Sequence, residues 1–248
     1  MRHRIWPAGQ PGMLALWSAP RCRSTAFARM ITERGDFTTL HEPFSHLADF
    51  GAARVGDVSA HDEAGLIAAI RSLAAENPVF FKDTTDFHYP GLLADQAFLA
   101  DAVHTFIIRD PAAAIASHYA LNPRLGRDEI GFAWLAEIYD AAAVASRTRP
   151  VVIDSDLLVR RPAETVAAYC RAVGMPFDPG ALSWVPGMRS EWQRTSRWHE
   201  STSGTSGFIP ATGRENARAL VANDPVLAGY LDYHLPFYEK LRQATITV

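Results

Sequence analysis

The stretch 13–30 constrains the fold of this chain more than any other. Residues 13–17 form a short apolar run that predicts a buried strand. Residues 18–24 form a polar turn, and apolar side chains recur at helical spacing over 25–31. A strand, a cationic turn and a helix in this order make a site for an anion, because the first free N–H groups of the helix point into the turn.

The turn carries the side chains that bind phosphate or sulfate. Arg21 and Arg23 flank Cys22, and the hydroxyls of Ser24 and Thr25 follow. A Walker A loop would place Lys directly before Thr25, where this chain has Ser24, so a cation that serves phosphates here is Arg21 or Arg23. The alternative is an ordinary strand–helix turn whose arginines are only solvated.

The rest of the chain repeats the strand–helix pattern. Further strands are predicted at 37–40, 78–81, 103–108 and 151–153. Helices are predicted at 62–75, 92–98, 111–121, 130–146, 162–173, 214–220 and 225–242. The alternation over 13–173 predicts an α/β fold with a central, mostly parallel sheet of about five strands. We expect one domain over 1–248 with an N-terminal tail over 1–12, and we make no prediction for 45–62.

Composition excludes several classes of partner. The net charge is −3, which gives no general attraction to nucleic acid or to an anionic membrane, so an anion site must be local. Cys22 and Cys170 lie far apart, without the spacing of metal ligands, and fit a reducing compartment. The chain has no apolar run of about 18 residues and no signal-like N-terminus. We therefore expect a cytoplasmic protein with no nucleic-acid or membrane partner and no metal.

Polar residues follow two of the predicted strands. His41 and Glu42 come directly after 37–40, and Lys82 and Asp83 come after 78–81. In an α/β sheet, chemistry takes place beyond the carboxyl ends of the strands. In an extended backbone His41 and Glu42 point to opposite sides, so we do not expect them to act together. Lys82 and Asp83 could line the pocket; as a surface ion pair they would contribute little.

A second phosphate-type motif follows the clearest strand, 103–108. Arg109 ends this strand, Asp110 and Pro111 suit the start of a helix, and Ser117 lies eight residues after Arg109. Together with the 20–25 loop, this pair resembles the sulfotransferase family that uses 3′-phosphoadenosine 5′-phosphosulfate (PAPS), especially its bacterial and carbohydrate-type branches. The resemblance implies a three-layer, P-loop-like fold and PAPS as co-substrate. It also implies that the loop holds the 5′-phosphosulfate and that Arg109 and Ser117 hold the 3′-phosphate.

The resemblance extends to about residue 178 and also has departures. The family often has Gly where Arg23 stands, and many members have Lys where Arg21 stands. A third family segment, basic and glycine-containing, clamps the 3′-phosphate near the C-terminus. Its nearest match here is 203–208, where Ser203 takes the place of the cation and Gly204 follows. The hydroxyls and glycine N–H groups of that segment could still bind an anion.

The resemblance also suggests a mechanism. Sulfuryl transfer resembles phosphoryl transfer, in which positioning and charge stabilisation do most of the work. Arg21 would stabilise the leaving phosphate, and Glu42 would take the proton of the acceptor, with His41 and His88 as the next candidates. The alternative is that Glu42 only pairs with Arg21 or Arg23.

One tryptophan-rich stretch suits a pocket for the acceptor. Three of the six Trp lie there, interleaved with cations: Trp184, Trp192, Trp198, Arg189, Arg194, Arg197 and His199. Aromatic and cationic residues on a loop-rich segment are typical of a binding pocket or lid. The alternative is that these Trp side chains pack the segment onto the sheet.

Three other functions stay open. A nucleotide-dependent phosphotransferase shares the strand–loop–helix arrangement, although the missing Walker Lys argues against it. A sulfotransferase-fold enzyme could act without PAPS on a phosphorylated or sulfated small molecule, which the Arg23 departure would fit. A binding module without catalysis is the third. The partner is a small-molecule acceptor that the sequence does not identify, and a homodimer is left open.

Overall fold

The computed structural model describes residues 12–146, 149–210 and 214–248. Its centre is a five-stranded, fully parallel sheet in the order β2-β5-β1-β6-β7. The strands are β1 (Met13–Ser18), β2 (Thr38–His41), β5 (Val79–Thr84), β6 (Ala102–Ile108) and β7 (Val151–Asp154). The predicted α/β class and the five-stranded parallel sheet are confirmed.

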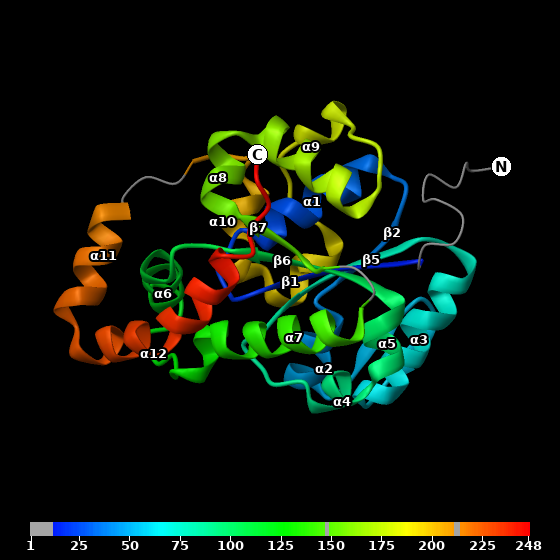
Figure 1. Ribbon diagram of the computed structural model, residues 1–248, viewed down its shortest axis with the longest axis horizontal. Helices are drawn as coiled ribbons and strands as arrows, with labels where there is room; N and C mark the ends of the chain where they lie inside the picture. The colour runs from blue at the N-terminus through cyan, green and yellow to red at the C-terminus, as the bar shows by residue number, and fades with distance from the viewer. Residues whose placement is uncertain (1–11, 147–148, 211–213) are drawn as a thin grey trace.

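Helices cover both faces of the sheet and make three layers (Figure 1). Leu14 and Leu16 of β1 pack on one face with α1 (Ser24–Arg34) and α9 (Pro162–Val173). Ala15 and Trp17 pack on the other face with α3 (Glu63–Glu76) and α7 (Phe132–Ala145). Both faces of β1 are buried, which is why its sequence is an unbroken apolar run.

Most helices begin and end close to the predicted positions. Besides α1, α3, α7 and α9, the sheet is accompanied by α4 (Pro90–Ala94), α5 (Gln96–Asp101), α6 (Pro111–Tyr119), α8 (Ser155–Arg160), α11 (Arg214–Asn223) and α12 (Pro225–Arg242). Asp110 caps α6 through the amide of Ala113 at 3.1 Å, as its sequence position suggests. The segment predicted as one helix at 92–98 is helical, but it is divided between two short helices. Asp95 ends α4 and accepts the amide of Phe98, so a second helix, α5, starts there.

The segment without a prediction contains three short elements. They are α2 (Pro43–Phe50) and a two-stranded hairpin of β3 (Ala53–Val55) and β4 (Val58–Ala60). Gly51 ends α2 at φ 69°, a conformation that favours glycine. These elements are too short to show a periodic pattern in the sequence.

The tryptophan-rich segment is also more regular than expected. It contains the 3₁₀ helices η2 (Pro179–Leu182) and η3 (Ser190–Trp198) and the short helix α10 (Glu200–Ser203); a further 3₁₀ turn, η1 (Asp128–Ile130), precedes α7.

In the part of the chain that the structure describes, no helix is both long enough and apolar enough to cross a membrane. The tail predicted over 1–12 lies outside the described residues except for its last position.

Candidate active site

A cavity of about 340 Å³ opens at the carboxyl edge of the sheet. Residues that follow β1, β2 and β6 line it, together with the end of β5 and the segment after η3. The centre of the sheet is also where the strand order reverses, since β2 and β5 lie on one side of β1 and β6 and β7 lie on the other. Ligands of open α/β sheets bind at such a position.

Three cavity residues have a strained backbone. Within the described part of the chain, Arg21, Arg23 and Glu42 are the non-glycine residues with positive φ, at 65°, 66° and 50°. Side chains other than glycine rarely adopt this conformation, and surrounding contacts must hold it. All three residues line the cavity. Strain of this kind gathers at functional sites.

The loop after β1 lines the cavity and is held in place by contacts of its side chains. Cys22 is fully buried, and burial raises the pKa of its thiol to about 12, so this side chain packs inward and stays neutral. Ser24 begins α1 and accepts a hydrogen bond from Ser18 Oγ at 2.7 Å. The guanidinium of Arg23 turns to Asp156 at 2.6 Å and to Ser155 Oγ at 3.1 Å. Arg23 thus neutralises a carboxylate of α8.

Glycine is required directly behind this loop. Gly131 has φ +84°, and a Cβ there would lie 2.5 Å from the carbonyl oxygen of Thr85 and 2.9 Å from Cδ of Pro20. Thr85 Oγ1 donates to the carbonyl of Gly131 at 2.8 Å. The start of α7 therefore packs directly against the loop after β1.

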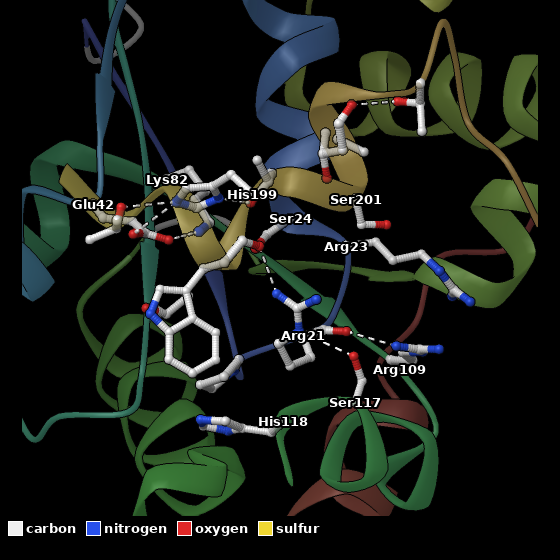
Figure 2. Close-up of a pocket in the computed structure, with 18 of the residues that line it drawn as sticks. Arg21, Arg23, Ser24, Glu42, Lys82, Arg109, Ser117, His118, His199 and Ser201 are labelled. Carbon is white, nitrogen blue, oxygen red and sulfur yellow. Dashed lines mark hydrogen bonds and ion pairs between the residues drawn. The ribbon is translucent and has the colours of Figure 1, made fainter. Parts of the chain in front are cut away.

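Arg21, Arg109 and Ser117 form one group although they are distant in the sequence (Figure 2). Arg21 Nε donates to Ser117 Oγ at 3.1 Å, and Arg109 Nη1 donates to the carbonyl of Arg21 at 3.1 Å. The second bond from Arg21 goes to the carbonyl of Trp198 at 2.7 Å. Neither guanidinium forms an ion pair with any residue that the structure describes, and burial lowers the pKa of both.

Glu42, Lys82 and His199 line the opposite end of the cavity, and His41, which is not in the lining, lies directly behind Glu42 and His199. Lys82 Nζ donates to Glu42 Oε1, and both side chains are buried. His41 Nε2 lies 3.5 Å from Glu42 Oε2 and 3.2 Å from His199 Nε2. Thr25 Oγ1 lies 3.3 Å from His199 Nδ1, which links this group to the loop after β1.

This geometry corrects three expectations. His41 and Glu42 face the same cluster, because the left-handed backbone at Glu42 breaks the alternation of an extended strand. The partner of Glu42 is Lys82, and not Arg21 or Arg23. Lys82 and Asp83 are no surface pair: both lie in β5 and are buried, and Asp83 binds the start of α2.

The protonation states follow from burial and charge. Burial alone would raise the pKa of Glu42, but Lys82 and the two imidazoles outweigh it and hold this pKa well below its ordinary value. Burial lowers the pKa of His41 and lowers that of His199 to about 4. At neutral pH the carboxylate of Glu42 is therefore ionised and the imidazoles of His41 and His199 are neutral.

The same group contains the one set of metal-type ligands found among the described residues. One ligand atom each of His41, Glu42 and His199 lies within 4.8 Å of the others. Two imidazoles and a carboxylate are donors that zinc accepts. The ammonium of Lys82 already compensates the carboxylate, however, so the residues account for their own charge without a cation.

The remaining candidates lie at different distances from the cavity. Ser203 donates to the carbonyl of Glu200, and neither Ser203 nor Gly204 lines the cavity; the neighbouring Ser201, Thr202 and Thr205 do. His88 is also outside the lining and pairs with Glu137 at 2.9 Å on an exposed surface.

Two residues of the cluster had no assigned role in the sequence. Lys82 was only a candidate lining residue, and its register beside His41 in the parallel β2–β5 pair brings it to Glu42. His199 was one cation among several in the tryptophan-rich stretch. Its heavy burial, which a solvated face would not have, is a tertiary property that no local pattern shows.

The sequence of this chain is similar to those of two curated proteins. Two curated proteins of Arabidopsis thaliana, named branched-chain-amino-acid aminotransferase-like proteins 2 and 1, are each 25% identical over 240 and 244 residues. These matches cover 91% and 94% of this chain, which spans only about two fifths of the length of either relative (40% and 42%).

Among solved structures, similar chains include the sulfotransferase domain from the curacin biosynthetic pathway (14% identity, TM-score 0.44, 90% of this chain and 97% of that one). A sulfotransferase from Mycobacterium avium is also similar (14% identity, TM-score 0.43, 92% and 77%). The family model described as the sulfotransferase domain matches residues 13–245. The match covers the sheet, the loop after β1 and the whole cavity, and the chain belongs to the sulfotransferase domain family.

Proposed function

We propose that this protein moves a sulfuryl group from PAPS to a hydroxyl or amine of a small molecule. The observation that carries the proposal is the pair Arg21 and Arg109. Two partly buried guanidinium ions face one cavity, and no described carboxylate pairs with either. Arg109 Nε is in addition buried without a hydrogen-bond partner among the described residues. Buried cations in this state favour a ligand with several negative charges.

The two ends of the cavity suit the two ends of PAPS. Arg109 and Ser117 bind the 3′-phosphate, and the amides of the loop, with Ser24 and Thr25, bind the 5′-phosphate. We call Glu42, Lys82, His41 and His199 the Glu42 cluster. Figure 2 shows Arg21 between Arg109 and this cluster. Arg21 therefore stabilises the charge on the leaving phosphate as the bond from sulfur to the bridging oxygen breaks.

The Glu42 cluster receives the proton of the acceptor. The acceptor oxygen or nitrogen attacks sulfur, the products are the sulfated acceptor and adenosine 3′,5′-bisphosphate, and the proton passes to Glu42. In its pair with Lys82, Glu42 is fully ionised but weakly basic, since its pKa is lowered. The neutral imidazoles of His41 and His199 stand beside it and accept a proton in turn.

Binding of adenosine 3′,5′-bisphosphate tests the donor. We expect this nucleotide to raise the melting temperature, and we expect ATP with Mg²⁺ to raise it much less. The reverse order would replace PAPS by a nucleotide phosphotransfer donor. No shift with either ligand would leave a sulfotransferase-fold protein that does not use PAPS.

Glu42→Gln tests the base. Turnover of PAPS should fall by orders of magnitude while adenosine 3′,5′-bisphosphate still binds. Glu137→Gln, an exposed carboxylate paired with His88, is the matched control and should leave both unchanged. If the single variant unfolds, Glu42→Gln combined with Lys82→Met removes the uncompensated charge and is measured in the same way. A folded variant with wild-type turnover removes Glu42 from this role.

A further inference from the structure

Asp83 is fully buried beneath the cavity and binds four donors. Its Oδ2 accepts the amide of Phe44 at 2.6 Å. Its Oδ1 accepts the amide of Ser45 at 3.1 Å, the hydroxyl of Ser45 at 2.6 Å and the amide of Thr84 at 3.0 Å. Asp83 does not line the cavity, so it cannot touch the substrates directly.

Phe44 and Ser45 are in the first turn of α2, whose free amides need a partner. The residue before a helix usually supplies that partner with its own side chain. Here that residue is Glu42, which makes no such bond, because its carboxylate points to Lys82 and its backbone is left-handed. Asp83, from the neighbouring strand, takes over the task.

We propose that Asp83 is a positioning residue: it caps α2 in place of Glu42 and so holds the Glu42 carboxylate in the cavity. This inference rests on the proposed function for its catalytic meaning, and on the hydrogen bonds above for its geometry.

Consecutive residues of β5 hold Glu42 from two sides. The carbonyl of Lys82 accepts the amide of Glu42 at 2.7 Å, while the ammonium of Lys82 binds its carboxylate. Asp83 then binds the amides of Phe44 and Ser45 in the first turn of α2, directly after Glu42. Tyr89 closes the arrangement, since its hydroxyl lies 3.0 Å from Ser45 Oγ and donates to the carbonyl of Thr84 at 2.7 Å. The strained backbone of Glu42 lies between the contacts of Lys82 and those of Asp83. Loss of the Asp83 hydrogen bonds would therefore let the backbone of Glu42 relax to an unstrained φ.

Asp83→Asn tests the proposal, because an amide keeps the shape but presents N–H groups to the amides of α2. The reaction measured is release of sulfate from PAPS with water as the acceptor, so no natural acceptor is needed. We expect kcat to fall at least tenfold, while the affinity for adenosine 3′,5′-bisphosphate stays within twofold. We also expect the acid limb of the kcat profile to move up in pH, because a Glu42 carboxylate that leaves Lys82 regains a more ordinary pKa.

Asp62→Asn is the matched control. Asp62 caps α3 through the amide of Gly65 at 2.7 Å, at an exposed position away from the cavity. The variant makes the same change from carboxylate to amide at a helix cap, where Asn serves about as well as Asp, and it should keep both kcat and the pH profile. If Asp83→Asn does not fold, Ser45→Ala, which removes one of the four bonds, should still lower kcat about threefold with unchanged nucleotide affinity.

The outcomes separate the two proposals. A wild-type chain that does not bind adenosine 3′,5′-bisphosphate overturns the proposed function, and a crystal structure of Asp83→Asn then decides the positioning alone. Glu42 in its present conformation in that crystal structure overturns the inference. Where the nucleotide does bind, an unchanged kcat, or a kcat and an affinity that fall together, overturns the positioning role and leaves the sulfotransferase function intact.

Discussion

The buried pair of Lys82 and Glu42 allows a quantitative prediction that needs no substrate. Lys82 is 1% exposed and Glu42 is 8% exposed. Lys82→Met leaves a buried carboxylate without its cation, and breaking a buried pair in this way destabilises a protein by about 3–5 kcal/mol. Replacing both residues, with Lys82→Met and Glu42→Gln, leaves no uncompensated charge and should bring the stability back to within about 1 kcal/mol of the wild type.

Urea unfolding at pH 7 measures these differences, provided that the m-values stay the same. The double-mutant cycle should then give a coupling free energy of at least about 3 kcal/mol. Lys240→Met is the matched control, since Lys240 pairs with Asp140 on the surface, with side chains 48% and 53% exposed. Loss of a surface pair should change stability by less than about 1 kcal/mol.

The pH dependence gives a second check on the same variant. In the wild type the pKa of Glu42 is lowered, so its contribution to stability is present above its unfolded pKa and is lost as pH falls through the folded value. In Lys82→Met the strongest influence that opposes burial is gone, so the pKa of Glu42 should rise, and the penalty of the variant should be large at pH 7 and shrink toward pH 4. A variant within about 1 kcal/mol of the wild type at pH 7, or an additive cycle, would refute the reasoning.

Three further predictions concern the cavity and the core. Arg109→Lys removes the planar fork and should weaken binding of adenosine 3′,5′-bisphosphate about tenfold by calorimetry; equal affinity would contradict the assigned role. Gly131→Ala places a Cβ against Thr85 and Pro20 at φ +84° and should destabilise the fold by at least about 2 kcal/mol in urea, while an unchanged midpoint would show that the loop yields. Burial lowers the pKa of His104 to about 4, so stability should fall as pH drops from about 6.5 to 4, and His104→Gln should flatten that slope.

The fold was predictable because its signals are local. The apolar run of β1, the Pro111 start of α6 and the Gly174 end of α9 are each visible within a few residues of sequence. The cationic loop that follows β1 was visible in the same way, since its cations and hydroxyls are consecutive, and its binding of an anion stays a prediction. The structure adds that Arg23 turns to Asp156, a residue more than a hundred positions away.

The Glu42 cluster was only partly predictable. Its position at a strand end was visible, but its conformation was not, because the sequence suggests an extended backbone and the structure has a left-handed one. The contribution of His199 depends on a segment after η3 that folds back onto the carboxyl edge of the sheet. No periodic pattern in the sequence predicts that this segment packs against the carboxyl edge of the sheet.

The sequence alone determined the order of the main strands and helices and the position of the cationic loop after β1, because hydrophobic period and turn chemistry act over short distances. The tertiary structure decided which charges meet: Lys82 with Glu42, Arg109 with the loop after β1, and Asp83 with the first turn of α2. These partners come from different strands, so their encounter depends on sheet order and register, which single residues do not reveal.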